Sequence, residues 1–165
     1  MGVYAAEALI SQARQLAAEY RRTMGKPLPG ISSEIATHDA IRLLELEPVE
    51  GGGGGYDAVD PARDGLRIQI KSRTIFDETK SGQRLGQIKV DQPWDAVVLV
   101  LMDEEYEPYE IYEVERDELL EYMAKSSSSR IKRGALSIAR FKIIGRLAWT
   151  REAGLEPEVW DNQAS

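Results

Sequence analysis

Three side chains in the middle of the sequence have the types and the spacing that phosphodiester hydrolysis needs. Asp57 follows a run of five glycines, and Gln69 and Lys71 lie 12 and 14 positions after it. The Asp57 carboxylate, the Gln69 side-chain carbonyl and the Ile70 backbone carbonyl are hard oxygen donors, which suit Mg²⁺ or Mn²⁺. Lys71 would hold or deprotonate the attacking water. We therefore predict a metal-dependent phosphodiesterase site, with Asp57 and Gln69 as metal ligands.

The local sequence predicts a hairpin that would bring these side chains together. Residues 66–72 alternate apolar and polar side chains, which is typical of a strand with one face on the core. Gln69 and Lys71 then project from the opposite face, side by side. Residues 61–65 read as a turn, and residues 56–59 as the preceding strand. We expect this hairpin to place Asp57 beside Gln69.

The rest of the chain predicts helices and strands around this hairpin. Residues 96–101 are all apolar, which predicts a central strand covered by helices on both faces. The other expected elements are an N-terminal helix over 3–23, a helix capped by Ser32 or Ser33, strands over 46–49 and 109–114, a helix over 116–125, a loop over 74–92 with one helical turn, and a basic helix capped by Ser137 that runs through Leu147. The apolar stripe of the N-terminal helix is formed by Val3, Leu9, Ile10, Ala13, Leu16, Ala17 and Tyr20. The pattern predicts an α/β sandwich with a mixed sheet and a loosely ordered tail beyond Glu152.

Three segments of the sequence together resemble the PD-(D/E)xK nucleases. They are Gly30-x3-Glu34, Gly55-Tyr56-Asp57-Ala58-Val59-Asp60 and Ile68-Gln69-Ile70-Lys71-Ser72-Arg73. The resemblance covers about residues 28–115 and is greatest to the branch in which Gln replaces the second acidic residue, as in Mrr-type restriction nucleases.

The resemblance implies a fold and a set of roles. The fold would be a restriction-endonuclease-like three-layer sandwich, with a central mixed sheet flanked by helices. Asp57 and Gln69 would be the metal ligands, Lys71 the catalytic cation, and Glu34 a helical acid that binds water or a second metal. We expect one domain over residues 1–165, with its core at 28–115 and a basic helical extension at 130–150.

The distribution of charge along the sequence indicates whether the protein can bind nucleic acid. The net charge of −7 would repel phosphate if it were uniform, but residues 63–90 carry 7 basic and 3 acidic side chains, and residues 125–151 carry 8 basic and none acidic. Residues 91–124 between them carry 1 basic and 12 acidic side chains. Either these blocks pair with one another within the fold, or the basic ones contact phosphate. For the second case we expect nucleic acid, DNA above all, to bind at Arg73, Lys80, Arg84 and Lys89.

Composition excludes several other chemistries. The chain has no cysteine and one histidine, His38, so disulfides, thiolate zinc sites and cysteine nucleophiles are excluded. No stretch approaches the length of a membrane span, and we expect a cytoplasmic protein without a membrane partner. The sequence is also compatible with a homodimer, since nucleases that cut both strands often act as dimers.

Alternative interpretations remain open. Gln69 and Lys71 can form an ordinary solvated strand face while Asp57 caps a turn. The chain can also be a catalytically silent nuclease-like module that binds DNA or a protein partner, because Gln69 is neutral. A third alternative is an interaction protein that uses the acidic segment 103–121 as its contact surface.

Overall fold

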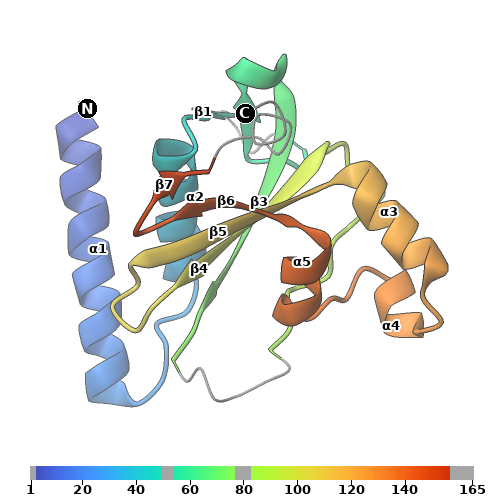
Figure 1. Cartoon of the computed structure of the whole chain (residues 1–165). Helices are drawn as coiled ribbons and strands as arrows, with labels where there is room; N and C mark the ends of the chain where they lie inside the picture. Colours follow the sequence, from blue (N-terminus) through green and yellow to red (C-terminus); the bar gives the residue numbers. More distant parts are fainter. Residues whose placement is uncertain (1–2, 50–53, 77–82, 157–165) are drawn as a thin grey trace.

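A computed structural model describes residues 3–49, 54–76 and 83–156 and shows a mixed α/β fold around a seven-stranded sheet (Figure 1). The strands are β1 (Glu47–Pro48), β2 (Ala58–Asp60), β3 (Leu66–Thr74), β4 (Ala96–Met102), β5 (Pro108–Glu115), β6 (Arg146–Thr150) and β7 (Gly154–Leu155). The helices are α1 (Val3–Met24), α2 (Ile31–Leu43), α3 (Arg116–Lys125), α4 (Ser129–Lys132) and α5 (Ile138–Ile144), with a 3-10 turn, η1 (Pro61–Arg63). The expected α/β class with a mixed sheet is confirmed.

The strands lie across the sheet in chain order, and β3 and β4 are the only parallel neighbours among those described. A parallel pair needs a connection that returns the chain to the same end of the sheet. Residues 75–95, here called the crossover segment, make that connection. The part of this segment that the structure describes contains turns and a bridge between Arg84 and Ser137. The helical turn expected in 74–92 is absent from that part.

β4 lies at the centre of the sheet, as its composition predicts. All of its residues are buried, and they enter two hydrophobic clusters on opposite faces. Val98 and Val100 pack in the cluster formed with α1 and α2. Val97 and Leu99 pack in the cluster formed with α3, α5 and the crossover segment. Helices and the crossover segment therefore cover both faces of the strands that carry the candidate site.

The inward face of α1 differs from the predicted apolar stripe. Leu9 and Leu16 are 51% and 56% exposed, whereas Ala17 is fully buried. Arg14 points inward and donates to the buried Asp39 of α2, at 2.8 Å for the shorter ion-pair distance. The small alanine side chains leave room for this ion pair between the two helices. The predicted stripe was therefore wrong for Leu9 and Leu16, whereas Ala17 is buried as predicted.

The start of α2 and the strands near the glycine run also differ from the prediction. α2 begins at Ile31 behind Gly30, which has a φ of 82° and supplies no side-chain hydrogen bond. The serine cap expected at Ser32 or Ser33 was therefore wrong. β2 begins at Ala58 rather than at residue 56. Asp57 consequently lies immediately before the strand instead of on it.

The basic helical extension expected over 130–150 is helical only in part, and the prediction was wrong after Ile144. Ser137 does cap α5, because its hydroxyl accepts the Arg140 N–H at 3.1 Å. The helix then ends at Ile144, and the chain enters β6, which pairs with β5. A Cβ on Gly145 would lie 2.8 Å from the backbone oxygen of β5 that it faces, so glycine permits this sharp change of direction. The C-terminal part thus extends the central sheet, and β7 follows it where a loosely ordered tail was expected.

Candidate active site

Asp57 is held at the edge of β3 by its backbone and by its carboxylate. Its N–H donates to the Ile68 carbonyl at 2.8 Å, and its Oδ2 accepts the Ile70 N–H at 2.8 Å. β2 pairs with β3 only from Ala58 onward. The Asp57 carboxylate therefore accepts the Ile70 N–H, which a backbone carbonyl would accept if the strand pairing continued. The side chain itself is exposed. The hairpin that the sequence predicts therefore does bring Asp57 to the strand that carries Gln69 and Lys71.

Gln69 is oriented by the last glycine of the run. Its Nε2 donates to the Gly55 carbonyl at 3.1 Å, and Oε1 is buried with no hydrogen-bond partner among the residues that the structure describes. Gly55 has a φ of 115°, and a Cβ there would lie 2.5 Å from Gln92 Oε1 and 2.9 Å from Pro93 Cδ. A buried acceptor left unpaired costs about 1–3 kcal/mol, so such an atom is expected to meet a water molecule or an ion.

Lys71 lies on the same strand face as Gln69, as the alternation predicts. Gln69 lies beside Val97 of β4, and Lys71 lies beside Leu99. Both β4 residues belong to the hydrophobic cluster formed with α3, α5 and the crossover segment. Burial, together with the positive charge of Arg73, lowers the pKa of Lys71 below its ordinary value. The Asp57 carboxylate opposes this shift, and Lys89 adds to it. The Lys71 ammonium is thus within electrostatic reach of Asp57.

Arg73 extends the line of cations along β3. Its Nε donates to the Arg84 carbonyl and one terminal nitrogen donates to the Ser72 carbonyl, each at 2.8 Å. Burial lowers the pKa of Arg73, although a guanidinium stays charged. A Cβ on Gly86 would lie 3.8 Å from Lys71 Nζ and 4.0 Å from the Arg73 guanidinium. Both cationic groups therefore lie next to Gly86 of the crossover segment, which has no side chain.

A cavity of about 240 Å³ lies between the start of α2 and this part of β3. Its lining residues are Ser32, Ser33, Ala36, Ile70, Lys71, Ser72, Arg73 and Gly86. Ser32 and Ser33 of α2 thus line the same cavity as Lys71 and Arg73 of β3. Asp57 and Gln69 are not among the lining residues.

Glu34, the predicted helical acid, lies in the first turn of α2 and is exposed. In the part of the chain that the structure describes, it shows no hydrogen bond or ion pair to Asp57, Gln69 or Lys71. Ser32 and Ser33 reach the cavity instead. The role of Glu34 stays a prediction, and the geometry brings together the other three residues.

Two further side chains that the sequence brings near the site lie elsewhere. Asp60 is buried, accepts the Ala62 N–H, and pairs with Arg63 at 2.7 Å. Arg63 in turn bonds the buried Glu113, so Asp60 belongs to a structural network. His38 lines a different cavity, beside the Arg14 ion pair. Neither residue competes with Asp57 for the role of ligand.

The residues predicted to contact nucleic acid differ in their positions in the structure. Arg84 and Lys89 are exposed on the crossover segment, and Arg73 lies beneath it. Lys80 lies outside the described residues. The sequence did not identify Gly55, Gly86, Ser32 and Ser33 as parts of the site. The glycine run was the only local signal, and it was interpreted as a turn or a loop.

The donor set suits a divalent cation only in part. Asp57 supplies a carboxylate, and Gln69 supplies an Oε1 that has no partner, both of which are hard oxygens. Among the described residues no three His, Asp or Glu side chains gather into a metal cluster. Any metal here would therefore be held by one carboxylate, one amide oxygen and a backbone carbonyl, with water completing the coordination.

None of the helices that the structure describes combines the length and apolarity of a membrane span. Comparison of the sequence with models of protein families and with curated proteins yields no match. The assignment of chemistry to this chain consequently depends on the geometry at the edge of β3.

Proposed function

We propose that this protein is a metal-dependent nuclease that hydrolyses phosphodiester bonds, with its active site at the edge of β3. The observation that carries the proposal is the convergence there of the Asp57 carboxylate, the unpartnered Gln69 Oε1 and the Lys71 ammonium. We also infer that the fold is the restriction-endonuclease-like sandwich. The support for it is that these three groups lie together at the part of β3 where its pairing with β2 has stopped, within a mixed sheet covered on both faces.

Each residue has a distinct part in this proposal. Asp57 and Gln69 would hold Mg²⁺ or Mn²⁺, together with the Ile70 carbonyl. The bound cation would polarise the phosphate and lower the pKa of a water molecule. Lys71 orients that water and stabilises negative charge on the phosphoryl oxygens. Its lowered pKa makes it easier to deprotonate than an exposed lysine, which suits a role in proton transfer.

The DNA-cleaving activity can be tested with plasmid and single-stranded substrates in the presence of Mg²⁺ or Mn²⁺. Lys71→Ala should cleave about 100-fold more slowly than the wild type, or not at all. Lys26→Ala is the matched control, because Lys26 is an exposed lysine that follows α1, outside the site. Equal cleavage by the wild type and Lys71→Ala would contradict the proposal, since a contaminating nuclease would then explain the activity.

A second candidate function, a catalytically silent module that binds nucleic acid, is favoured by the charge balance of the site. Among the described residues, Asp57 is the one carboxylate that acts on Lys71, whereas Arg73 and Lys89 both add positive charge there. Such a balance attracts phosphate more strongly than it attracts a metal cation. Titration calorimetry with Mn²⁺ separates the two functions. Absence of metal binding, alongside measurable DNA binding, would favour the silent module.

A further inference from the structure

The two basic blocks of the sequence are joined in the structure, although an acidic block separates them in the chain. Residues 83–89 of the crossover segment run beside residues 130–140, here called the distal basic segment. The bonds between them are Leu85 N–H to Leu136 O at 3.0 Å, Ile88 N–H to Gly134 O at 3.0 Å, Ile138 N–H to Gln83 O at 2.9 Å and Gln87 Nε2 to Arg133 O at 2.8 Å. Gly134 has a φ of 88°, and a Cβ there would overlap the Ile88 carbonyl. The close approach of the two segments therefore requires glycine at this position.

The basic side chains of the two blocks fall into two sets. One set forms ion pairs within the fold: Arg63, Arg67, Lys125, Lys142, Arg146 and Arg151. In the described part of the chain, the other set has no carboxylate within 4.0 Å: Lys71, Arg73, Arg84, Lys89, Arg130, Lys132, Arg133 and Arg140. The unpaired set lies on β3, the crossover segment and the distal basic segment. Internal pairing thus involves part of the acidic block but leaves this set of cations without a carboxylate partner among the described residues.

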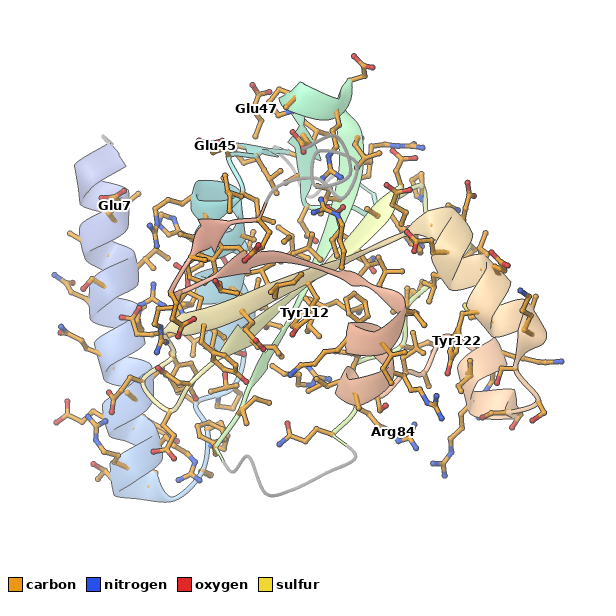
Figure 2. All side chains as sticks on the ribbon, viewed as in Figure 1. Glu7, Glu45, Glu47, Arg84, Tyr112 and Tyr122 are labelled. Atoms are coloured by element: carbon orange, nitrogen blue, oxygen red, sulfur yellow. The ribbon has the colours of Figure 1, made fainter. Side chains whose placement is uncertain are left out.

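The unpaired cations form a path that begins at the candidate active site. Arg73 donates to the Arg84 carbonyl, and Arg84 forms a bridge with Ser137 at the start of α5. Figure 2 shows the Arg84 side chain projecting next to α5. All six basic side chains beyond Arg73 on this path are exposed: Arg84, Lys89, Arg130, Lys132, Arg133 and Arg140.

We propose that residues 83–89 and the distal basic segment form one surface that binds the phosphate backbone of duplex DNA. Neither residues 83–89 nor residues 130–140 contain an aromatic side chain, so these segments offer no platform on which unpaired bases could stack. Of the aromatic rings in the hydrophobic cluster beneath them, Trp94 and Phe141 are fully buried, and Tyr122 is partly buried. Contact through phosphates, which is typical of duplex binding without base readout, is the mode that this composition supports. The role of this surface in presenting DNA to Lys71 rests on the proposed nuclease function.

The proposal can be tested by fluorescence anisotropy with a labelled DNA duplex in EDTA, so that no cleavage occurs. The double variant Arg130→Gln/Arg133→Gln should raise Kd about tenfold and reduce the slope of log K against log salt by about 2, because two phosphates would each lose a cationic partner. Lys125→Gln is the matched control, because Lys125 belongs to the same basic block but pairs with Glu121 at 2.7 Å. Circular dichroism checks that the variants are folded.

Three results would overturn the proposal: a double variant that binds like the wild type, an equal weakening of binding in Lys125→Gln, or tighter binding of a single strand than of the duplex. Its failure is distinguishable from failure of the nuclease function. A wild-type protein that binds the duplex but does not cleave it with Mn²⁺ would contradict the nuclease alone. Cleavage that persists together with unchanged binding by the double variant would contradict the surface alone.

Discussion

Gln69→Glu tests the metal site through the stability of the fold, without reference to activity. In the wild type, Gln69 Nε2 donates to the Gly55 carbonyl, and Oε1 is buried. The substitution replaces this donor with a carboxylate oxygen facing a carbonyl oxygen, so it removes a hydrogen bond and buries negative charge. We expect the free energy of unfolding without metal to fall by about 1–3 kcal/mol. Lys71, on the same strand face, offsets part of this decrease by attraction.

Metal should reverse the effect of this substitution. An anionic oxygen binds Mg²⁺ or Mn²⁺ more tightly than a neutral amide oxygen does. A ligand at 100 times its Kd stabilises the folded state by about 2.7 kcal/mol. Gln69→Glu should therefore recover most of its stability in saturating Mn²⁺ and gain more from the metal than the wild type gains.

The assay is urea denaturation of the wild type, Gln69→Glu and Gln69→Met in EDTA and in Mn²⁺. Gln69→Met keeps the size of the side chain but removes its oxygen, so it should show no stabilisation by metal. If Mn²⁺ raises the midpoint of Gln69→Glu no more than it raises that of the wild type, then position 69 does not contact the metal. The site would then have to be redrawn around Asp57.

Three further perturbations follow from the packing around the site. Gly55→Ala should lower the free energy of unfolding by about 1–3 kcal/mol, because its Cβ would lie closer than 3 Å to the crossover segment; Gly54→Ala, which meets no atom within 4 Å, should cost less in the same urea titration. Although burial opposes it, hydrogen bonding from Arg63 lowers the pKa of Glu113 below its ordinary 4.5. This stabilisation is therefore complete above about pH 4.5 and disappears as the pH falls through the lowered value; Glu113→Gln should cost about 3 kcal/mol at pH 7 and flatten the acid limb of a stability–pH curve. Arg116→Gln removes a guanidinium that donates to three carbonyls of the crossover segment, so hydrogen exchange of that segment's amides should accelerate, and unchanged exchange would refute the role of Arg116 as its anchor.

The sequence predicted those parts of the fold that local patterns determine. The alternation in β3 correctly assigned Gln69 and Lys71 to one face, and the uniformly apolar β4 was correctly placed at the centre. The region after Ser137 was misjudged, because Ile143, Ile144 and Leu147 fit a helical spacing as well as a strand. Gly145 was the local signal that the helix ends.

The parts of the site that escaped prediction depend on contacts between distant residues. The bond from Gln69 to Gly55 and the approach of Ser33 to the cavity are set by how the loop and α2 pack against β3. The pairing of residues 83–89 with residues 130–140 joins segments about 50 positions apart, and no periodicity within either segment indicates it. Charge counting detected both blocks but could not show that they meet.

The most direct test of the central claim is the initial rate of Mn²⁺-dependent cleavage of a DNA duplex by the wild type and by Asp57→Asn. The asparagine oxygen can still accept the Ile70 N–H that Asp57 accepts at 2.8 Å, so the fold should persist while the metal-binding charge is removed. The proposal predicts a wild-type rate that depends on Mn²⁺ and falls about 100-fold or more in Asp57→Asn. A folded Asp57→Asn that cleaves the duplex at the wild-type rate would show that the edge of β3 is not the catalytic site.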